Sequence, residues 1–536
     1  MKEVTQWFVD QGWRPQAFQK ECWKAYAKGL NGMLHAPTGS GKTFALWGGI
    51  IQEAFDVKRH PTGLQALWLT PLRALAVEIQ KATQRMTTDL IPELQVALRT
   101  GDTSQTERIK QKQKPSFGLV TTPESLHVIL STKDHQKQFK NLKVIIVDEW
   151  HELLGTKRGV QVELALAYLR SFLPVLKVWG ISATLGNKDL AREILLGPLE
   201  NYTIVNADIN KKINVKSILP KKMESFPWRG HLGIQLLPHV LKLVKKNKTT
   251  LIFTNTRAQC EIWFHQLLDA DPNLAGSMAM HHGSIDKKLR LWVEEALRKE
   301  QLKAVVCTSS LDLGVDFSPV ENCVQIGSPK GVGRFIQRAG RSGHNPKAKS
   351  KIHFLPTHAM ELVESVALQR GIESQQIEDR MPYLNTYDVL LQFLMTLAVG
   401  SGFQPKKLFP IIKQTFCFQT LNHKRWQWII NFLVKGSQSL EYYDEYKKVN
   451  VLEDGSLRVL NKGIAMRHRL SMGTIVSDAN LKVRYQKGGY LGTVEEWFVA
   501  KLKPGDVFTF SGRNLELIRM HNMEVIVRKS KSKKGR

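Results

Sequence analysis

A glycine-rich stretch that ends in a lysine and a threonine is the first feature of this sequence with a chemical meaning. Residues 36–43 read Ala-Pro-Thr-Gly-Ser-Gly-Lys-Thr and lie between a short apolar run and a helical pattern. Glycines let a backbone wrap around phosphates, and the amides at a helix N-terminus bind their negative charge. Lys42 is then expected to reach the β- and γ-phosphates of a nucleotide, and Thr43 to ligate Mg²⁺. The alternative is a chance Gly-Lys-Thr turn, since Ala36 stands where the general pattern has its first glycine.

Two adjacent carboxylates follow an apolar run farther along the chain. Asp148 and Glu149 come directly after residues 143–147, which have the pattern of a buried strand. A carboxylate at the end of such a strand can hold Mg²⁺, and its neighbour can orient the water that attacks a phosphate. An isolated Asp-Glu pair is usually part of a solvated loop. Beyond a phosphate-binding loop, however, the pair predicts the second half of an ATPase site.

These groups need a sheet that brings them to one edge. Short apolar runs alternate with helical patterns through residue 208, which is typical of a doubly wound α/β domain with parallel strands. The strands predicted there are 33–36, 66–70, 117–121, 143–147 and 178–182. The alternation resumes in 209–380, with predicted strands at 250–254, 304–308, 323–327 and 351–355. The basic, proline-containing segment 210–230 is interpreted as a linker.

The pattern changes after residue 380. Residues 387–399 and 425–434 have helical patterns, and 449–459 reads as a hairpin with Asp-Gly at its turn. Helices followed by a hairpin predict a winged-helix domain, which we assign to 381–460. Short strands and glycine turns then predict a β-rich domain over 461–536, ending in a basic tail.

Composition limits the partners of the chain. Its 536 residues include 77 Lys and Arg against 48 Asp and Glu, a net charge of +29. Such a surplus attracts polyanions, so nucleic acid, an anionic membrane and ribosomal neighbours all fit. The five cysteines form no CxxC pair, which favours reduced packing cysteines in a cytosolic protein over a zinc or iron–sulfur site. Because we find neither a signal core nor a long apolar span, we expect no membrane association.

Further motifs narrow the function. Besides the glycine-rich loop and Asp148-Glu149-Trp150-His151, the chain contains Ser182-Ala183-Thr184 and Gln337-Arg338-Ala339-Gly340-Arg341-Ser342-Gly343-His344. Together these resemble the motif set of superfamily 2 helicases. Four more stretches resemble the large helicase-related (Lhr) family, specifically its ligase-associated bacterial branch: 70–76, 121–126, 281–284 and 467–478. The resemblance extends from about residue 7 to residue 528. It implies two RecA-like domains in tandem, followed by the winged-helix and β-rich domains.

The resemblance implies an ATP site divided between the two RecA-like domains. Gln19 would read the adenine edge, and Trp13 or Phe18 would pack near the base. Arg341 would be the arginine finger, whereas His344 replaces a second arginine of many relatives. The implied nucleotide-binding positions are Gln19, Thr38, Gly39, Ser40, Gly41, Lys42, Thr43, Gly314 and Asp316. The implied catalytic positions are Lys42, Asp148, Glu149, Gln337, Arg338 and Arg341. Thr43 and Asp148 would hold Mg²⁺, and Ser182 and Thr184 would couple hydrolysis to domain movement.

The resemblance also implies contacts with the phosphates of a nucleic acid strand, which carry position and not sequence. The implied positions are Thr70, Arg73, Thr100, Gly101, Thr122 and Glu124 on the first domain and Thr254, Asn255, Arg257, His282 and Thr308 on the second. Each of them alone is as well explained as a turn or cap residue. Trp426 and Trp428 lie two apart on a helical pattern and cannot share one face. We expect one in the core and the other exposed, as a candidate for base stacking.

The implied activity is ATP- and Mg²⁺-dependent 3′-to-5′ translocation on single-stranded DNA, with unwinding of duplex or RNA–DNA hybrid in DNA repair. An RNA-directed motor of the same superfamily stays open. A catalytically silent scaffold is disfavoured because Lys42, Thr43, Asp148, Glu149 and Arg341 are all present. We expect a cytoplasmic, nucleoid-associated monomer, with a ligase or nuclease of a repair operon as a candidate partner. Because the family's C-terminal region usually continues farther, truncation of this chain also stays open.

Overall fold

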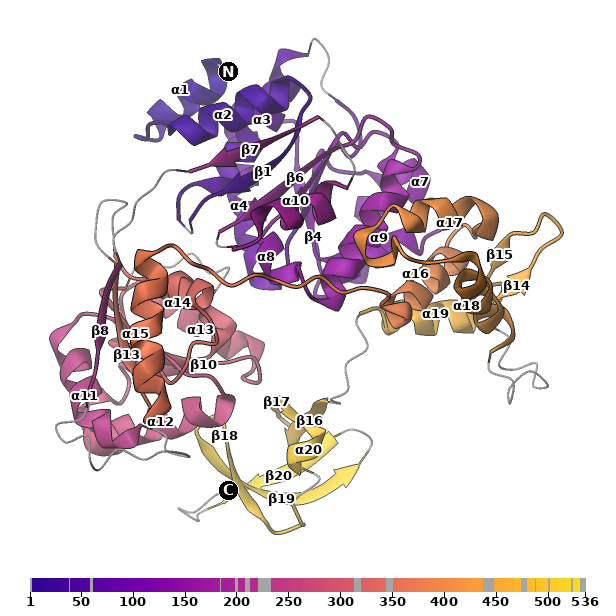
Figure 1. Ribbon diagram of the computed structural model, residues 1–536. Coiled ribbons are helices and arrows are strands. Elements are labelled where there is room, and N and C mark those ends of the chain that lie inside the picture. The colour runs from indigo at the N-terminus through magenta and orange to yellow at the C-terminus, as the bar shows by residue number, and fades with distance from the viewer. Residues whose placement is uncertain are drawn as a thin grey trace. The chain divides into compact units, whose positions relative to one another are not determined.

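The structure is a computed structural model that describes residues 2–37, 39–57, 61–183, 185–197, 201–207, 213–219, 233–312, 320–343, 350–436, 448–473, 480–486, 488–499, 502–521 and 524–530. The chain divides into two compact units (Figure 1). The first comprises Met1–Asp208 and Asp379–Ile475, and the second comprises Ile209–Glu378 and Val476–Arg536. Each unit therefore combines one α/β region with a segment from the C-terminal part of the chain.

A seven-stranded parallel sheet forms the centre of the first unit, with strand order β3-β4-β2-β5-β6-β1-β7. Its strands are β1 (Asn31–His35), β2 (Ala66–Leu69), β3 (Val96–Arg99), β4 (Gly118–Thr121), β5 (Val144–Val147), β6 (Lys177–Ser182) and β7 (Tyr202–Asn206). The strands β1, β2, β4 and β5 are buried along their whole length, which explains their continuous apolar sequences. Because the strands are parallel, their carboxyl ends lie along one edge of the sheet.

Helices connect these strands and place their first turns at the same edge. They are α1 (Lys2–Asp10), α2 (Ala17–Ala27), α3 (Lys42–Asp56), α4 (Arg73–Leu90), α5 (Gln105–Gln113), α6 (Pro123–Leu130), α7 (His135–Phe139), α8 (Trp150–Leu153), α9 (Lys157–Arg170) and α10 (Lys188–Leu196). The helices α3, α4, α6 and α8 each begin a few residues after β1, β2, β4 and β5, respectively. Side chains in these short connections are consequently the ones that the sheet brings together.

A winged-helix domain belongs to the first unit. Its elements are α16 (Tyr387–Val399), α17 (Pro405–Lys413), the 3₁₀ helix η5 (Phe416–Phe418), α18 (His423–Lys435), β14 (Asn450–Val451), β15 (Leu457–Arg458) and α19 (Lys462–Leu470). The antiparallel pair β14–β15 confirms the predicted hairpin. Gly455 at its turn has a φ of +73°, a conformation that glycine adopts without strain.

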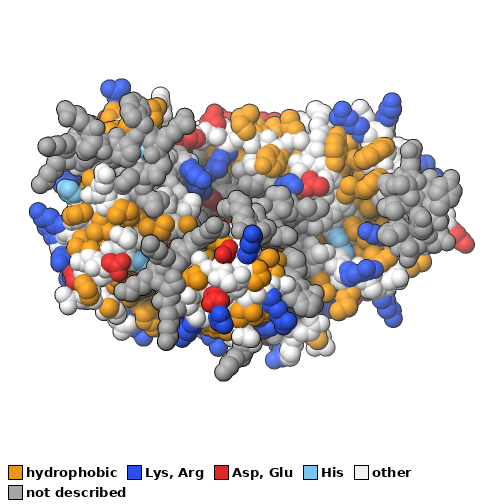
Figure 2. Space-filling view, turned by 90° about the horizontal axis from the view of Figure 1, so that it is seen from below, with side chains coloured by type: hydrophobic (Ala, Val, Ile, Leu, Met, Phe, Trp, Pro, Cys, Tyr) orange, Lys and Arg blue, Asp and Glu red, His pale blue; other side chains and the backbone are white. Residues whose placement is uncertain are grey.

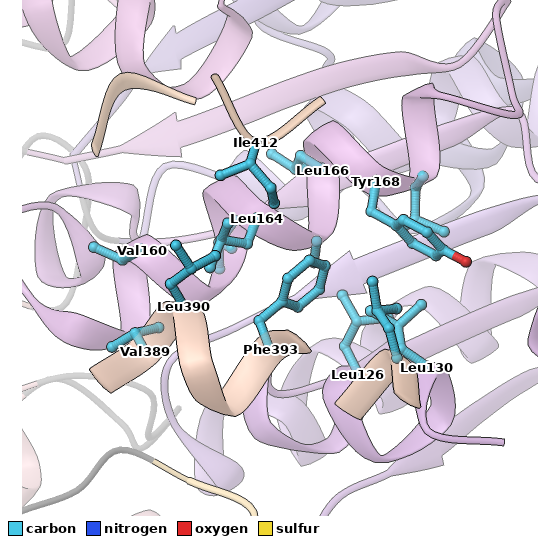
Figure 3. Close-up of a cluster of buried hydrophobic side chains, with 14 of the residues drawn as sticks. Leu126, Leu130, Val160, Leu164, Leu166, Tyr168, Val389, Leu390, Phe393 and Ile412 are labelled. Carbon is cyan, nitrogen blue, oxygen red and sulfur yellow. The ribbon is translucent and has the colours of Figure 1, made fainter. Parts of the chain in front are cut away.

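The winged helix shares an apolar core with the α/β region of its unit. The side chains in this cluster include Leu126 and Leu130 of α6, Val160 and Leu164 of α9, and Val389, Leu390 and Phe393 of α16 (Figure 3). Polar pairs lie beside it: Lys157 Nζ is 2.6 Å from Asp388 Oδ2, and Gln161 donates to Gln392 at 3.2 Å. Burial of each apolar side chain contributes roughly 1.5–3 kcal/mol. The shared core therefore attaches the winged helix firmly to the α/β region of its unit.

The second unit contains a six-stranded parallel sheet of order β10-β11-β9-β12-β13-β8. Its strands are β8 (Ile213–Ser217), β9 (Thr250–Phe253), β10 (Met278–His281), β11 (Ala304–Cys307), β12 (Asn322–Ile326) and β13 (Ser350–Leu355). Its helices are η2 (Ile234–Leu236), α11 (Leu237–Lys246), α12 (Arg257–Ala270), η3 (Pro272–Leu274), α13 (Lys287–Arg298), η4 (Ser309–Leu311), α14 (Val332–Ala339) and α15 (Met360–Glu373). The linker interpretation of 210–230 was wrong for residues 213–217, because β8 pairs with β13 and completes the sheet edge.

A five-stranded β-sheet of order β17-β16-β20-β19-β18 also belongs to the second unit. Its elements are β16 (Asn480–Tyr485), β17 (Tyr490–Glu495), α20 (Glu496–Val499), β18 (Val507–Phe510), β19 (Arg513–His521) and β20 (Glu524–Lys529). The amides of Ser511 and Gly512 donate to the carboxylate of Glu261, on α12, at 2.6 and 3.4 Å. These contacts attach the small sheet to the α/β region of its unit. Within the described ranges, no helix is long and apolar enough to cross a bilayer.

Candidate nucleotide site and nucleic-acid interface

The glycine-rich loop leads from the end of β1 at His35 to the start of α3 at Lys42. Gly39 and Gly41 have φ values of +76° and +83°, so each occupies a backbone region that favours glycine. The Ser40 hydroxyl is buried and has no hydrogen-bond partner among the described residues. A buried polar group without a partner is costly unless a ligand satisfies it. The loop, with the N-terminus of a 15-residue helix behind it, therefore fits a phosphate group. Thr38 lies outside the described residues.

Asp148 and Glu149 lie at the carboxyl end of β5, and both are buried. Asp148 Oδ1 accepts from the Glu149 amide at 2.8 Å, and Oδ2 accepts from Trp68 Nε1 at 3.4 Å. Burial and the neighbouring Glu149 raise the pKa of Asp148 to about 7, although Lys42 opposes them. Two buried carboxylates on adjacent residues favour a cation between them and a phosphate. The residues present thus fit the predicted Mg²⁺ site.

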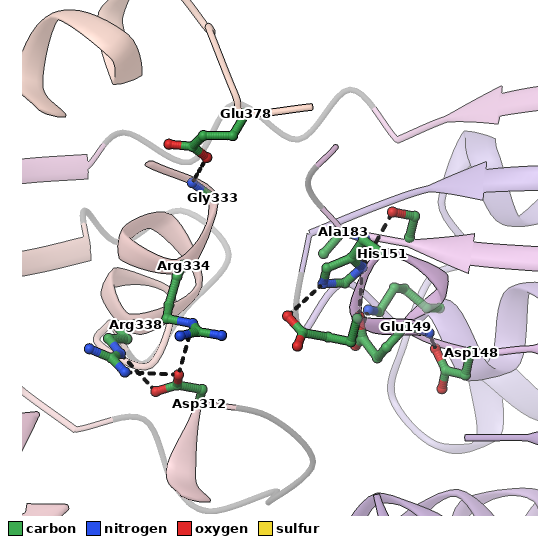
Figure 4. Close-up of polar contacts among 12 residues, drawn as sticks. Asp148, Glu149, His151, Ala183, Asp312, Gly333, Arg334, Arg338 and Glu378 are labelled. Atoms are coloured by element: carbon green, nitrogen blue, oxygen red, sulfur yellow. Dashed lines mark hydrogen bonds and ion pairs between the residues drawn. The ribbon is translucent and has the colours of Figure 1, made fainter. Parts of the chain in front are cut away.

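A chain of polar contacts links the glycine-rich loop to the end of β6. Lys42 Nζ lies 2.7 Å from Glu149 Oε1, and Glu149 Oε2 lies 3.5 Å from His151 Nδ1. The same ring nitrogen lies 3.3 Å from Ser182 Oγ and accepts from the Ala183 amide at 3.4 Å (Figure 4). Burial lowers the pKa of His151, which keeps the ring neutral, so that Nδ1 accepts from the Ala183 amide and does not donate to Glu149. His151 therefore lies between Glu149 and Ser182 and brings the ends of β5 and β6 close together. Thr184 lies outside the described residues.

Gln19 lies beside the glycine-rich loop. Its Nε2 donates to the Gly41 carbonyl at 3.1 Å, and its Oε1 accepts from the Gln16 amide at 2.8 Å. A Cβ at residue 41 would lie 2.8 Å from Gln19 Nε2, so this close approach also requires glycine. Trp13 is 41% exposed with the Arg85 guanidinium 5.1 Å from its ring centroid, whereas Phe18 is buried. Trp13 is therefore the more accessible of the two aromatic candidates for the base.

The second unit holds its predicted arginines on and just after α14. Arg338 is buried, donates to both oxygens of Asp312 at 2.8 and 3.0 Å, and also donates to Gln325 (Figure 4). Its guanidinium lies 5.0 Å from the Phe253 ring centroid. Arg341 donates to the Asp312 carbonyl at 3.2 and 2.8 Å and is only partly buried. Arg341 is thus the more accessible arginine, while Arg338 is engaged within the unit.

The other predicted site residues of this unit are either buried or outside the described residues. Gln337 is buried on α14. Gly314, Asp316 and His344 lie outside the described residues. Asp312 and Gln325, which hold Arg338 in place, were not among the predicted site residues. Asp312 lies in the same stretch as the predicted Gly314 and Asp316, whereas only the packing of β12 beside α14 brings Gln325 to the arginine.

Comparison with known proteins finds helicases of one kind. The DEAD/DEAH box helicase domain matches residues 16–192, the helicase conserved C-terminal domain matches 233–345, and the winged-helix domain of large helicase-related proteins matches 370–536. The ATP-dependent helicase Lhr-Core of Sulfolobus acidocaldarius is 32% identical in an alignment of 548 positions that covers 99% of this chain and 62% of that protein. The chain is therefore similar to large helicase-related (Lhr) proteins over nearly its whole length. It spans about 62% of the length of that relative.

Solved structures support the same assignment for the fold. The Mycobacterium smegmatis helicase Lhr bound to ssDNA and AMP-PNP matches with a TM-score of 0.77 and 27% identity, over 88% of this chain and 62% of that one. The helicase MrfA bound to DNA matches with a TM-score of 0.76 over 99% of this chain and 69% of that one. At 19% identity the second likeness concerns the fold alone. The two α/β regions of this chain are RecA-like domains, as the sequence predicts.

The first RecA-like domain carries all six predicted strand-binding residues just beyond the carboxyl ends of its strands. Thr70 and Arg73 follow β2, Thr100 and Gly101 follow β3, and Thr122 and Glu124 follow β4. These strands are adjacent in the order β3-β4-β2, beside the β5 strand that carries Asp148. Arg73 pairs with Asp102 at 2.9 Å and Glu124 pairs with Arg158. The topology thus places the predicted strand positions next to the predicted nucleotide site.

The second RecA-like domain repeats this arrangement. Thr254, Asn255 and Arg257 follow β9, His282 follows β10, and Thr308 follows β11, three adjacent strands of its sheet. Asn255 Nδ2 donates to the Ser328 carbonyl at 2.7 Å, and Arg257 lies 3.3 Å from Glu495. His282 is buried with Nε2 3.5 Å from Glu261. Figure 2 shows Lys and Arg side chains scattered over the face in view, and the whole sequence carries a net charge of +29.

The two tryptophans of α18, in the winged helix, have different environments. Trp426 is 4% exposed and packs against Phe409, with ring centroids 5.4 Å apart. Trp428 is 59% exposed and stacks on Phe432, with centroids 5.5 Å apart and planes inclined by 17°. The expectation that one would be core and the other exposed is confirmed. Trp428 stays the candidate for base stacking.

Proposed function

We propose that this chain is an ATP-driven nucleic-acid translocase and helicase that tracks along single-stranded DNA. The observation that carries the proposal is the contact chain Lys42–Glu149–His151–Ser182, at the edge where the predicted strand positions also lie. A nucleotide site connected to neighbouring structure in this way suits a motor better than a passive binding protein. The M. smegmatis relative, which is described as bound to ssDNA, supports DNA as the strand.

Each side chain has a role that its position supports. Lys42 and the glycine-rich loop would hold the β- and γ-phosphates, and Thr43 and Asp148 would hold Mg²⁺. The metal would neutralise charge that develops on the transferred phosphate. Glu149 would orient the attacking water and accept its proton. Arg341, on the other RecA-like domain, would serve as the arginine finger.

Finer features of the function follow from the family resemblance. We propose 3′-to-5′ movement, unwinding of duplex or RNA–DNA hybrid ahead of the strand, and a role in DNA repair within the ligase-associated branch. Action as a monomer, and work beside a repair ligase or nuclease, belong to the same proposal. Sequence-independent grip is expected because the predicted contacts are hydroxyls, amides and guanidinium groups, which suit phosphates.

ATP turnover with and without a strand tests this function. Phosphate release is measured with no nucleic acid, with oligodeoxythymidylate and with oligouridylate. We expect DNA to stimulate turnover well above the basal rate, because strand binding favours the hydrolytic arrangement. Stimulation by RNA alone would replace the DNA assignment with an RNA-directed motor. Turnover indifferent to both would contradict the proposed motor.

A further inference from the structure

Arg158 forms a two-point ion pair with Glu124 on the first RecA-like domain. Its Nε lies 2.5 Å from Glu124 Oε1 and its Nη2 lies 3.2 Å from Oε2. Both side chains are 28% exposed, so the pair lies at the surface and is not sealed in the core. Arg158 Nη1 has no partner among the described residues. The pair therefore leaves one face of the guanidinium available to a ligand.

A direct contact between Glu124 and the phosphates of a strand would be unfavourable. A carboxylate repels phosphates, yet Glu124 lies in the first turn of α6, beside the N-cap residue Thr122. Burial raises the pKa of Glu124, but hydrogen bonds from Arg158 and its charge lower it more, so the group stays ionised. An ionised glutamate that holds an arginine in a fixed orientation avoids this unfavourable contact. In this arrangement the arginine presents the positive charge.

The place of Arg158 in its helix points to an anion as well. Arg158 and Lys157 occupy the first turn of α9, which contains no acidic residue. Cations at a helix N-terminus oppose its dipole and are unfavourable there. The fold compensates Lys157 with Asp388 and Arg158 with Glu124. A helix N-terminus that nevertheless carries two cations is unfavourable for folding alone and favourable for an anion.

A buried polar group at the adjacent strand end supplies an independent sign of a ligand. The Thr70 side chain is fully buried, and its hydroxyl has no hydrogen-bond partner among the described residues. The Thr70 amide donates to the Thr121 carbonyl at 3.0 Å, which places it beside the residue before Thr122. A hydroxyl in this condition is satisfied when a ligand oxygen approaches. Other charged groups also lie near this end of the strands. Arg73 is paired with Asp102, whereas Arg99 and Arg108 are two neighbouring cations, so positive charge is in excess.

The position of Arg158 is also fixed relative to the nucleotide site. The helix α8 begins directly after Glu149, and α9 follows it after one short turn. Gly159 packs so closely on this turn that a Cβ there would overlap the Leu153 carbonyl. The segment from Glu149 to Arg158 is therefore compact and connects the two residues through one short helix and one turn.

We propose that Arg158 binds a backbone phosphate of the tracked strand, and that Glu124 positions Arg158 and does not itself touch the strand. This inference rests on the proposed function, since it names the group that grips the same strand. The guanidinium fork suits a phosphate oxygen while its other side holds the carboxylate. Thr70 and the first turn of α6 would contribute neutral donors to the same phosphate.

The salt dependence of strand affinity tests the inference. The Kd for fluorescein-labelled oligodeoxythymidylate is measured without nucleotide over a range of salt concentrations. Each phosphate that a cation neutralises contributes about 0.7 to the slope of log K against log salt for single strands. Arg158→Ala should weaken binding roughly tenfold at low salt, as loss of a charge-assisted hydrogen bond does, and reduce the slope by about 0.7. A residue with a merely structural role would not change the slope.

Two variants separate charge from geometry. Arg158→Lys keeps the charge but not the fork, so the slope should stay near that of the unmodified chain while affinity falls severalfold. Glu124→Gln should also weaken binding with little change in slope, because Arg158 loses its orientation. If Glu124 merely repelled the strand, removal of its charge would strengthen binding. That result would overturn the positioning role.

A matched control lies at the amino ends of the strands of the same sheet, away from the predicted strand positions. Lys143 precedes β5 and pairs with Glu53 at 3.3 Å, at the amino ends of the strands. Lys143→Ala also removes one cation from an ion pair, and it should leave affinity and slope nearly unchanged. Equal losses in Lys143→Ala and Arg158→Ala, or an unchanged slope in Arg158→Ala, would contradict the inference. If the unmodified chain failed to bind the oligonucleotide, the proposed function itself would fail instead.

Discussion

Lys42 Nζ lies 2.7 Å from Glu149 Oε1, with 10% and 5% of these side chains exposed. The lysine of the glycine-rich loop and the second carboxylate of the Asp-Glu pair therefore neutralise each other within the first RecA-like domain. Removal of one partner from a buried pair leaves the other charge uncompensated, which is costly. A phosphate that attracts Lys42 would release Glu149 toward water. We therefore expect the two residues to exchange partners when a nucleotide binds.

Lys42→Ala should reduce ATP turnover on the order of 10²-fold or more, because a donor aimed at the phosphates is lost. Strand affinity should remain within a few-fold of the unmodified chain, since the predicted strand positions follow β2, β3 and β4 and not β1. Phosphate release and oligonucleotide titration measure the two quantities. Comparable turnover in the variant would remove the assignment of this loop.

Glu149→Gln should bind ATP but hydrolyse it on the order of 10²- to 10⁴-fold more slowly, because an amide cannot accept the proton of the attacking water. The amide oxygen can still accept from Lys42, so this variant should be less destabilised than Lys42→Ala. Nucleotide binding is followed with a fluorescent ATP analogue, and turnover by phosphate release. Hydrolysis within a few-fold of normal would exclude Glu149 as the base.

Glu163 predicts a pH dependence of stability for the first unit. Burial raises its pKa from 4.5 to about 8, and its Oε2 accepts from the Cys417 amide at 3.0 Å, between α9 and the winged helix. The folded chain therefore keeps a proton that the unfolded chain has lost. The stabilisation is complete below pH 4.5, declines as pH rises, and is lost above about pH 8.

Glu163→Gln should remove that decline, since glutamine stays neutral. Thermal unfolding of both chains at pH 5 and pH 9 checks this, with the variant relatively more stable at pH 9. An identical pH dependence in the two chains would show that Glu163 is not the titrating group.

Trp428 and Trp426 provide a pair of substitutions on one helix. Trp428→Ala should weaken single-strand binding, because base stacking on an aromatic contributes about 1–3 kcal/mol per base, and should change stability little. Trp426→Ala should instead destabilise the fold by about 3–5 kcal/mol, as loss of a buried aromatic does. Oligonucleotide titration and denaturant unfolding separate the effects. Unchanged affinity in Trp428→Ala would exclude a base-stacking role for Trp428.

The sequence allowed prediction of both sheets because their central strands are continuous apolar runs after which chemical motifs begin. Three strands at the edges of the sheets were not predicted. In β8, Ile213 and Val215 alternate with polar residues inside a basic segment, and β3 and β7 are only partly buried. Local patterns could not reveal these, since pairing with β13, β4 and β1 defines them.

Contacts between residues that are far apart in the sequence could not be predicted either. Arg158 and Asp312 were not among the predicted site residues, yet each holds one that was predicted. The grouping of the winged helix with the first RecA-like domain, and of the last sheet with the second, also depends on tertiary packing. Lys157 with Asp388 and Glu261 with Ser511 illustrate the two contacts. Neither pair is adjacent in the chain, so no window of sequence contains it.

Strand displacement from tailed duplexes tests the central claim most directly. A labelled duplex with a 3′ single-stranded tail and one with a 5′ tail are incubated with ATP and Mg²⁺, and Glu149→Gln serves as the inactive control. A motor that grips one strand and moves 3′ to 5′ should displace only from the 3′ tail, and more slowly as salt rises and phosphate contacts weaken. Equal displacement from the 5′ tail would contradict the direction, and displacement by Glu149→Gln at the normal rate would contradict an ATP-driven motor.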